Sequence, residues 1–281
     1  MRRLIMAILV AVGCWIGSSG CATVEGTNRK QLMLISGSQE LQLGENAWRV
    51  ALASAQPSHD ETWTRVIRRV GPRIAAVSGH PDFDWEFRLF ESGQVNAFCL
   101  PGGKVAFYSA IMPILQNEGA VAVVMGHEVA HAIARHGAER VSQAIAVQIA
   151  ARVASSAAGQ WAPQYADSIM NGFGLATTLG VTLPFSREQE GEADYLGLQY
   201  AARAGYDPRE GVAVWQRMGA YAKRHGGKPP EFLSTHPSDE HRVAKMEKYM
   251  NDAMALYATA PTRYERGEDW STRVLAEAGE K

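Results

Sequence analysis

The alternation of apolar and polar residues predicts a small sheet in the first part of the chain. Residues 83–89 alternate apolar and polar side chains, as a half-buried strand does. Residues 95–100 and 104–108 flank the triplet Pro101-Gly102-Gly103, which is the pattern of a hairpin with a short glycine turn. We therefore expect a small, mostly antiparallel sheet.

Helical periodicity dominates the rest of the chain. Asp60 or Thr62 is expected to cap one helix, and Asn117 is a suitable N-cap for another. The pattern of apolar positions predicts helices over residues 39–55, 62–74, 118–136, 141–158, 187–204, 208–224 and 239–257. The predicted fold class is therefore α+β, a single mainly helical domain with a small sheet.

The first twenty residues have the pattern of a secretory signal peptide. Two arginines follow Met1, residues 4–16 form an apolar run, and small residues precede Cys21. The run is shorter than the roughly 20 residues that a helix needs to cross a bilayer. We interpret residues 1–20 as a lipoprotein signal peptide, with Cys21 as the lipidated residue. An ordinary secretory signal that is cut nearby is the alternative.

The remaining boundaries follow from the same patterns. Residues 21–38 are polar and mixed without a sustained period, and we interpret them as a tether. Residues 39–258 hold the predicted domain, and residues 259–281 are predicted to be a polar, loosely held tail. The chain has 281 residues and a formal net charge of −1, so no nucleic-acid partner is expected.

The strongest chemical signal is the segment 127–131, which reads His-Glu-Val-Ala-His after an apolar helical run. On a helix, His127 and His131 lie on one face one turn apart, so both imidazoles can reach one ion. Glu128 is offset around the helix, near enough to bond a metal-bound water without binding the metal. Zinc keeps one position for such a water in catalytic sites, where a carboxylate can take its proton. The segment predicts one catalytic zinc ion, and a chance match on a core helix is the alternative.

A third ligand is expected farther along the chain. A metzincin would need glycine at position 134 and histidine at position 137, and the sequence has Ala134 and Gly137 instead, which excludes that family. Glu190 and Asp194 lie four apart on one face of a predicted helix. One of them can bind the metal while the other accepts a hydrogen bond from a ligand histidine.

Three neighbouring groups are predicted to have no part in the chemistry. Glu188 and Glu192 lie off the face shared by Glu190 and Asp194, and we interpret them as a solvated helix face. His136 comes five residues after His131, on another face, where it can meet the carbonyls at the end of the helix.

Several motifs together resemble the peptidase family of CAAX prenyl proteases, HtpX and mitochondrial Oma-type proteases. The motifs are His127–His131 followed by Arg135-His136, Ser186–Asp194, Asn96-Ala97-Phe98 followed by Pro101-Gly102-Gly103, and Ser234–Pro237 with Arg242. The resemblance spans residues 39–250 and implies a gluzincin-type domain with Glu190 as the third zinc ligand and Asp194 as its supporting partner. It is nearest to the short, single-domain bacterial lipoproteins of that family.

Further residues have candidate roles around this site. The resemblance places His236 at the metal, where it would donate to a developing oxyanion or occupy the open zinc position at rest. A purely structural His236 is the alternative, and Arg242 is a candidate supporting charge. Asn96 and Ala97 belong to the predicted hairpin, whose exposed edge can hold an extended peptide through main-chain hydrogen bonds.

The sequence therefore predicts a zinc-dependent endopeptidase of the bacterial cell envelope that cleaves unfolded or misassembled proteins. Lipid on Cys21 would anchor it to a membrane, and in a Gram-negative organism Ala22 in place of aspartate implies the outer membrane, facing the periplasm. One alternative is an envelope chaperone or assembly factor that acts mainly by binding. Another is a structural zinc site that a fourth protein ligand closes. Oligomeric state and natural substrates are not determined by the sequence.

Overall fold

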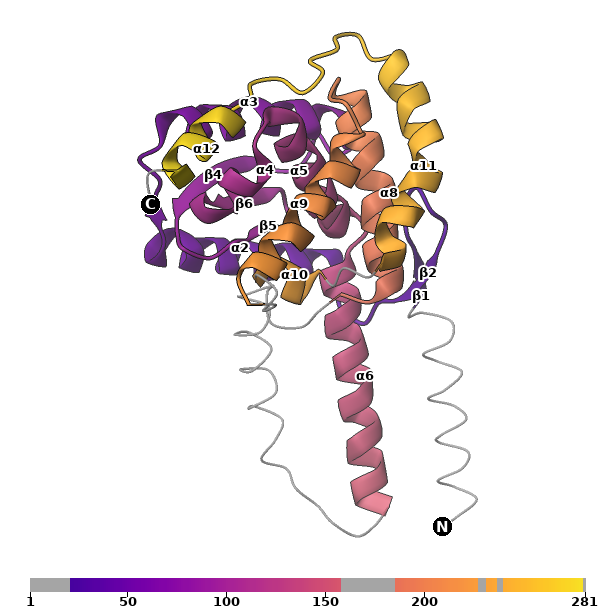
Figure 1. Ribbon diagram of the computed structural model, residues 1–281. Coiled ribbons are helices and arrows are strands. Elements are labelled where there is room, and N and C mark those ends of the chain that lie inside the picture. Colours follow the sequence, from indigo (N-terminus) through magenta and orange to yellow (C-terminus); the bar gives the residue numbers. More distant parts are fainter. Residues whose placement is uncertain (1–20, 158–184, 227–230, 237–239, 280–281) are drawn as a thin grey trace.

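A small sheet lies between helices in the computed structural model, which describes residues 21–157, 185–226, 231–236 and 240–279 (Figure 1). The predicted signal peptide lies outside these residues. The strands are β3 (Gln56–Pro57), β4 (Glu86–Glu91), β5 (Ala97–Leu100) and β6 (Lys104–Tyr108), in the order β3-β4-β6-β5. The predicted hairpin is confirmed, because β5 and β6 pair antiparallel. β4 pairs parallel with β6, a neighbour that alternation alone does not indicate.

Each face of the sheet packs against different helices. On one face, Trp48 of α2 (Gly37–Ser54) packs with Phe90 and Leu100 in a separate apolar cluster. On the other face, Val105 and Phe107 join the main core with α3 (Glu61–Val77) and α5 (Glu118–Ile133). Alternating side chains point to opposite faces of a strand, so the predicted period of two supplies both clusters.

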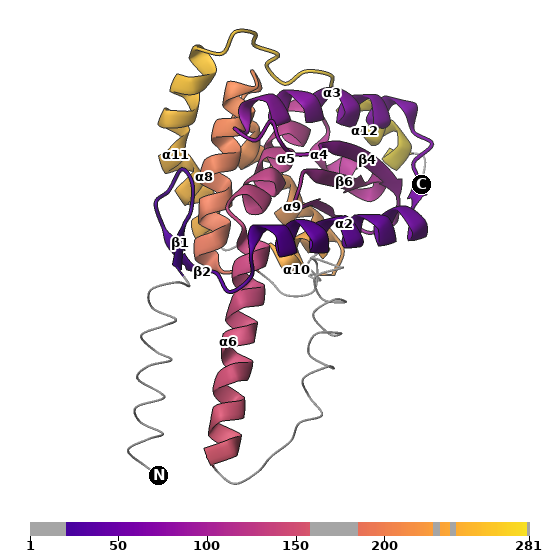
Figure 2. The same ribbon diagram turned by 180° about the vertical axis from the view of Figure 1, so that it is seen from behind.

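α5 is buried along its whole length, and further helices follow the sheet. They are α4 (Met112–Leu115), which follows a short 3-10 turn at Ser109–Ile111, then α6 (His136–Ala157), α8 (Arg187–Arg203), α9 (Glu210–Arg224), α10 (Glu231–Thr235), α11 (Glu240–Ala258) and α12 (Ser271–Gly279). In both ribbon views, α6 projects from the body while α8 and α11 run side by side along one flank (Figures 1 and 2). The predicted α+β, mainly helical class is confirmed.

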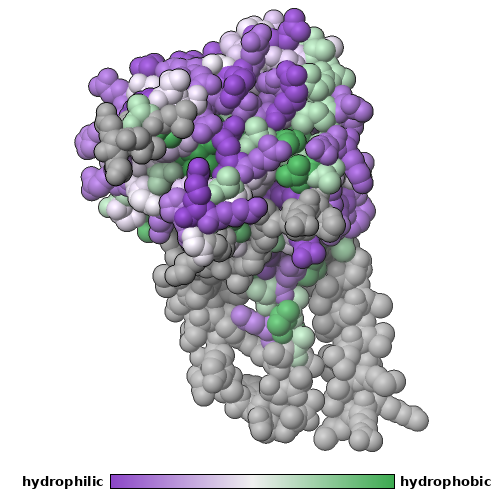
Figure 3. All heavy atoms as spheres, in the orientation of Figure 1, coloured by the Kyte–Doolittle hydropathy of each residue, from purple (hydrophilic) through white to green (hydrophobic). Residues whose placement is uncertain are grey.

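The surface of the body is mainly hydrophilic on the face that Figure 3 shows, with small hydrophobic areas between polar side chains. Within the part of the chain that the structure describes, every helix is too short or too polar to cross a membrane.

The segment predicted to be a tether is instead a hairpin packed on the domain. β1 (Cys21–Thr23) pairs antiparallel with β2 (Lys30–Leu32), and Val24 is buried in the turn between them. The buried amide of Gln31 donates to the carbonyl of Ala134 at the end of α5. These contacts are made with residues far away in the sequence, so the polar composition of the segment gives no sign of them.

The prediction of a loosely held tail was also wrong. The side chain of Trp270 is buried, and its indole N–H donates to the carbonyl of Met112. Short bridges join Asn117 to Asp269 and Tyr206 to Glu265. The segment is therefore fastened to the body by these bridges and by Trp270, although most of its polar side chains are exposed.

Candidate active site

The metal-binding helix is α5, which begins at Glu118 as predicted. The side chain of Asn117 accepts a hydrogen bond from the backbone N–H of Ala120, which satisfies one of the free donors at the helix start. The helix is apolar for two turns before His127, so burial of this run places both histidines inside the domain. Their side chains are each only 4% exposed.

The second supporting helix is α8, which carries Glu190 and Asp194 on one face. It begins with a capping box in which Ser186 and Gln189 satisfy each other's backbone donors. Glu190 and Asp194 are both buried. The predicted spacing therefore places both carboxylates on the face of α8 that meets the two histidines of α5.

Two glycines allow α5 and α8 to lie close enough for their side chains to meet. A Cβ atom on Gly126 would stand 2.7 Å from the carbonyl oxygen of Gly197. A Cβ atom on Gly197 would stand 2.7 Å from the backbone nitrogen of His127. The two backbones therefore touch directly beside the first histidine, where any larger residue would separate the helices.

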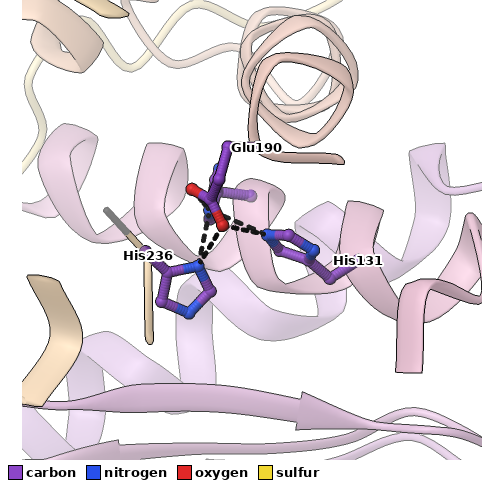
Figure 4. A group of neighbouring side chains, drawn as sticks. His131, Glu190 and His236 are labelled. Carbon is purple, nitrogen blue, oxygen red and sulfur yellow. Dashed lines mark hydrogen bonds and ion pairs between the residues drawn. The ribbon is translucent and has the colours of Figure 1, made fainter. Parts of the chain in front are cut away.

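Four side chains converge on one point: His127, His131, Glu190 and His236, with ligand atoms all within 4.8 Å of one another. Figure 4 shows Glu190 directed between His131 and His236. His127 Nε2 is 3.1 Å from His131 Nε2 and 3.3 Å from His236 Nδ1. Glu190 Oε1 is 3.4 Å from His131 Nε2 and 3.0 Å from His236 Nδ1.

These separations fit a tetrahedral metal ion. Ligand atoms at about 2.0–2.1 Å from zinc stand about 3.3 Å apart at the corners of a tetrahedron. The observed distances are near that value, and three imidazoles with one carboxylate are donors that zinc accepts. His236 Nδ1 lies at the fourth corner, so the structure brings this predicted site residue to the metal ligands.

Asp194 and Arg242 support the ligands from behind. Asp194 Oδ1 lies 3.0 Å from His127 Nδ1, which is the contact expected of a carboxylate that orients a ligand histidine. The guanidinium of Arg242 donates to both oxygens of Asp194 and lies 2.6 Å from Glu190 Oε2. It also stacks over Trp215, 3.6 Å from the ring centre. Arg242 is therefore a central support of the site, a larger part than its weak sequence signal indicated.

Burial and charge set the protonation of the ligands. Burial lowers the pKa of His127 and takes that of His131 well below its ordinary value, so both rings are neutral and can bind a cation. Burial acts to raise the pKa of Glu190, but the positive charges of Arg242 and His236 outweigh it and hold that pKa well below the ordinary value. Glu190 is therefore anionic, which suits a residue that would bind a metal ion.

Glu128 has the environment of a general base. Its side chain is buried, and Oε1 makes no hydrogen bond within the described residues, while His236 Nε2 lies 3.5 Å away. A buried carboxylate oxygen without a hydrogen bond beside a metal site would be free to accept one from a metal-bound water. Burial raises the pKa of Glu128 to about 7. The charge of His236 acts to lower this pKa, and the charge of Glu190 acts to raise it. A base with that pKa is suited to accept a proton near neutral pH.

The predicted surroundings of His136 and Glu192 were wrong, although neither belongs to the ligand set. His136 is fully buried, and its Nδ1 lies 2.8 Å from Nδ1 of His131. Its Nε2 lies 2.9 Å from Glu192, which is itself buried and not solvated. The reason is that α5 ends at Ile133 and Arg135 takes a left-handed backbone (φ 59°), which turns His136 back toward the metal helix.

Phe185 and Arg140 were not among the predicted site residues. The ring of Phe185 stacks on His131 with ring centres 3.8 Å apart. The guanidinium carbon of Arg140 lies 3.8 Å from the centre of the Phe185 ring. A single apolar residue before a capping box gives no sequence signal for this position. Phe185 therefore covers one face of the His131 ring.

The predicted edge residues Asn96 and Ala97 lie at the start of β5. β5 is the last strand of the sheet order, and Ala97 begins it, directly after the buried Asn96. The carbonyl of Asn96 accepts from the backbone N–H of Tyr108 on β6, so the side of the chain that faces β6 is already paired. Burial, and then the negative charge of Glu128, raise the pKa of the Cys99 thiol on β5, and β5 packs against α5. The edge strand therefore passes close to the site.

Comparison with known proteins gives the same class. Residues 61–250 match Peptidase family M48. The chain is 34% identical over 243 residues to the mitochondrial metalloendopeptidase OMA1 of Schizosaccharomyces pombe, a match that covers 85% of this chain and 69% of the relative. It is 30% identical over 215 residues to the β-barrel assembly-enhancing protease of Escherichia coli K12, covering 76% of this chain and 44% of the relative. The chain thus spans less than half the length of the E. coli protein.

The fold and the site define a metallopeptidase with two histidines from one helix and a glutamate from another. The chain belongs to peptidase family M48.

Proposed function

We propose that this metallopeptidase is a zinc-dependent endopeptidase that cleaves unfolded or misassembled proteins of the bacterial cell envelope. His127, His131 and Glu190 hold the ion, and Glu128 is the general base. The observation that carries the proposal is the near-tetrahedral set of ligand atoms beside the buried carboxylate of Glu128. Zinc is favoured because two of the three ligand atoms are imidazole nitrogens.

The chemistry divides between the ion and the protein. A zinc ion would polarise the peptide carbonyl and lower the pKa of a bound water to about 7. Glu128 accepts a proton, because its own pKa is about 7 and its Oε1 makes no hydrogen bond within the described residues. His236 Nε2, 3.5 Å from that oxygen, is placed to donate to charge that develops on the substrate.

The substrate class is inferred from the position of β5. An extended peptide that pairs with this edge would be held through its main chain, with little dependence on its side chains. Unfolded segments take that conformation most readily, because most backbone groups of a folded partner are already paired.

The cell-envelope location rests on residues 1–21. The charged start, the apolar run and the small residues before Cys21 are typical of a lipoprotein signal. Cys21 is exposed at the start of β1, so a lipid on it would not disturb the core. The names of the relatives do not point to one location. One is named as a mitochondrial protease, and another is a bacterial β-barrel assembly-enhancing protease. Labelling with a radioactive fatty acid should modify the wild type and not Cys21→Ala.

The activity is tested with Glu128→Gln. The variant should retain bound zinc and the folded structure but lose about 100-fold or more of the rate on unfolded casein, because it has no base. Glu188→Gln is the matched control, an exposed glutamate on α8, and should cleave at the wild-type rate. Equal cleavage by Glu128→Gln and wild type would overturn the proposed mechanism.

One observation favours a second candidate, a metal site that only stabilises the fold. His236 completes a four-ligand set, as structural zinc sites require. The same experiment separates the two functions. If the metal site is only structural, neither the wild type nor Glu128→Gln should cleave casein.

A further inference from the structure

The two histidines of the metal helix are oriented in different ways. His127 meets a carboxylate directly, with its Nδ1 3.0 Å from Asp194. His131 Nδ1 meets a second imidazole instead, that of His136 at 2.8 Å. His136 Nε2 in turn lies 2.9 Å from Oε2 of Glu192. A carboxylate therefore reaches His131 through one intervening ring.

The tautomers along this chain follow from its carboxylate end. Glu192 is an acceptor, so Nε2 of His136 carries the hydrogen and donates to it. Nδ1 of His136 is then the acceptor, and it receives the N–H of His131 Nδ1. This leaves the lone pair of His131 Nε2 directed at the metal-binding point, where a ligand histidine needs it.

Glu192 is itself fixed by the N-terminal hairpin. Arg29 donates from Nε to Oε2 of Glu192 at 2.8 Å, and the hydroxyl of Thr27 donates to Oε1. The other two guanidinium nitrogens of Arg29 donate to the carboxylate of Glu139 on α6, at 2.9 and 2.8 Å. Arg29 is mostly buried between the hairpin, α6 and α8, with 14% of its side chain exposed.

We propose that Thr27 and Arg29 are positioning residues for the metal site, acting on His131 through Glu192 and His136. This inference rests on the proposed function only in that His131 binds a metal ion. The hairpin is then part of the metal centre, although neither of its residues approaches the ion. Breaking its hold on Glu192 frees the His136 ring to turn, and His131 loses the partner that orients it.

The test measures metal affinity and not activity. Zinc competition with a chromogenic chelator on the purified full-length protein should show affinity about 10–100-fold weaker for Glu192→Gln and His136→Phe. Arg29→Gln and Thr27→Val should weaken it in the same direction. Arg69→Gln and Glu118→Gln are matched controls, because Arg69 also joins two carboxylates and Glu118 also meets two arginines, away from the site. Both controls should bind zinc as the wild type does.

A double variant distinguishes positioning from general destabilisation. If Arg29 acts through His136, adding Arg29→Gln to His136→Phe should cause no further loss of affinity, since the route is already cut. The visible spectrum of bound cobalt should change in Arg29→Gln and stay unchanged in Arg69→Gln. Thr27→Val removes one hydroxyl and keeps the inference testable if Arg29→Gln fails to fold.

The outcomes separate this inference from the proposed function. Wild type that binds no stoichiometric zinc contradicts the metal site itself. Wild type that binds zinc, with Arg29→Gln and Thr27→Val indistinguishable from the controls, overturns the positioning role alone. Additive losses in the double variant also overturn it.

Discussion

Asp194 holds two groups of the site at once, because it accepts from Arg242 and lies beside the ring of His127. Asp194→Asn should weaken zinc affinity about 10–100-fold, since an amide can present a donor to His127 Nδ1 and favour the wrong tautomer. The measurement is zinc competition with a chelator. Asp207→Asn is the control, an aspartate paired with Arg209 away from the site, and should bind as the wild type does. Equal affinities for the two variants would contradict the role of Asp194.

The residues that the sequence predicted at this scale are those whose positions follow from helical spacing. His127 with His131 and Glu190 with Asp194 are pairs four apart, and a helix alone places each pair on one face. His136 and Glu192 were assigned wrongly because their positions depend on the left-handed turn at Arg135 and on the hairpin that covers α8. Neither feature has a local sequence signal.

At the scale of elements, the contact of α5 with α8 sets the distance between the ligand pairs. Gly197→Ala should lower the free energy of unfolding by about 1–3 kcal/mol, because its Cβ would overlap the backbone at His127. Zinc affinity should fall as well, since the helices can only separate. Urea unfolding and chelator competition measure the two effects.

Gly219→Ala is the control for that substitution. It lies inside α9 with nothing near its Cβ position, so it should stabilise the protein by about 0.5–1 kcal/mol. A Gly197→Ala protein as stable as Gly219→Ala, with unchanged zinc affinity, would show that the close approach is not required.

Most elements of the domain were predictable because each carries its own local period or cap. Asp60 and Asn117 cap α3 and α5 as expected, and Pro72 lies within α3 without dividing it. The parallel pairing of β4 with β6 and the β1-β2 hairpin were not predicted. The parallel pairing is a choice between neighbouring strands that periodicity does not report. The hairpin is short, and it is held in place by distant partners such as Glu192 and Ala134.

At the scale of the whole molecule, the C-terminal segment is fastened to the start of the metal helix. Glu118 accepts from Arg69 and Tyr206, and from the backbone N–H of Glu268. Burial acts to raise the pKa of Glu118, but these donors outweigh it and lower that pKa. The ionised carboxylate therefore stabilises the fold above its ordinary pKa of 4.5, and this contribution is lost as the pH falls below that value.

Glu118→Gln should accordingly cost about 2 kcal/mol of unfolding free energy near neutral pH, a typical value for hydrogen bonds to a charged group. The difference from wild type should shrink below about pH 4.5, where protonation makes the two side chains alike. Urea unfolding across that pH range measures it. Glu45→Gln is the control, because Glu45 forms an exposed helical ion pair with Arg49. It should change the free energy of unfolding by at most about 0.5 kcal/mol. A difference for Glu118→Gln that is constant with pH would contradict the ion-pair account.

The most direct measurement for the whole account is the zinc content of wild type and Glu190→Gln after exhaustive dialysis. Wild type should retain about one zinc ion per chain, as a three-ligand protein site does. Glu190→Gln should fold and retain far less, because an uncharged amide replaces the anionic ligand beside His131. If the variant keeps as much zinc as wild type, the ion is not held where the two helices meet.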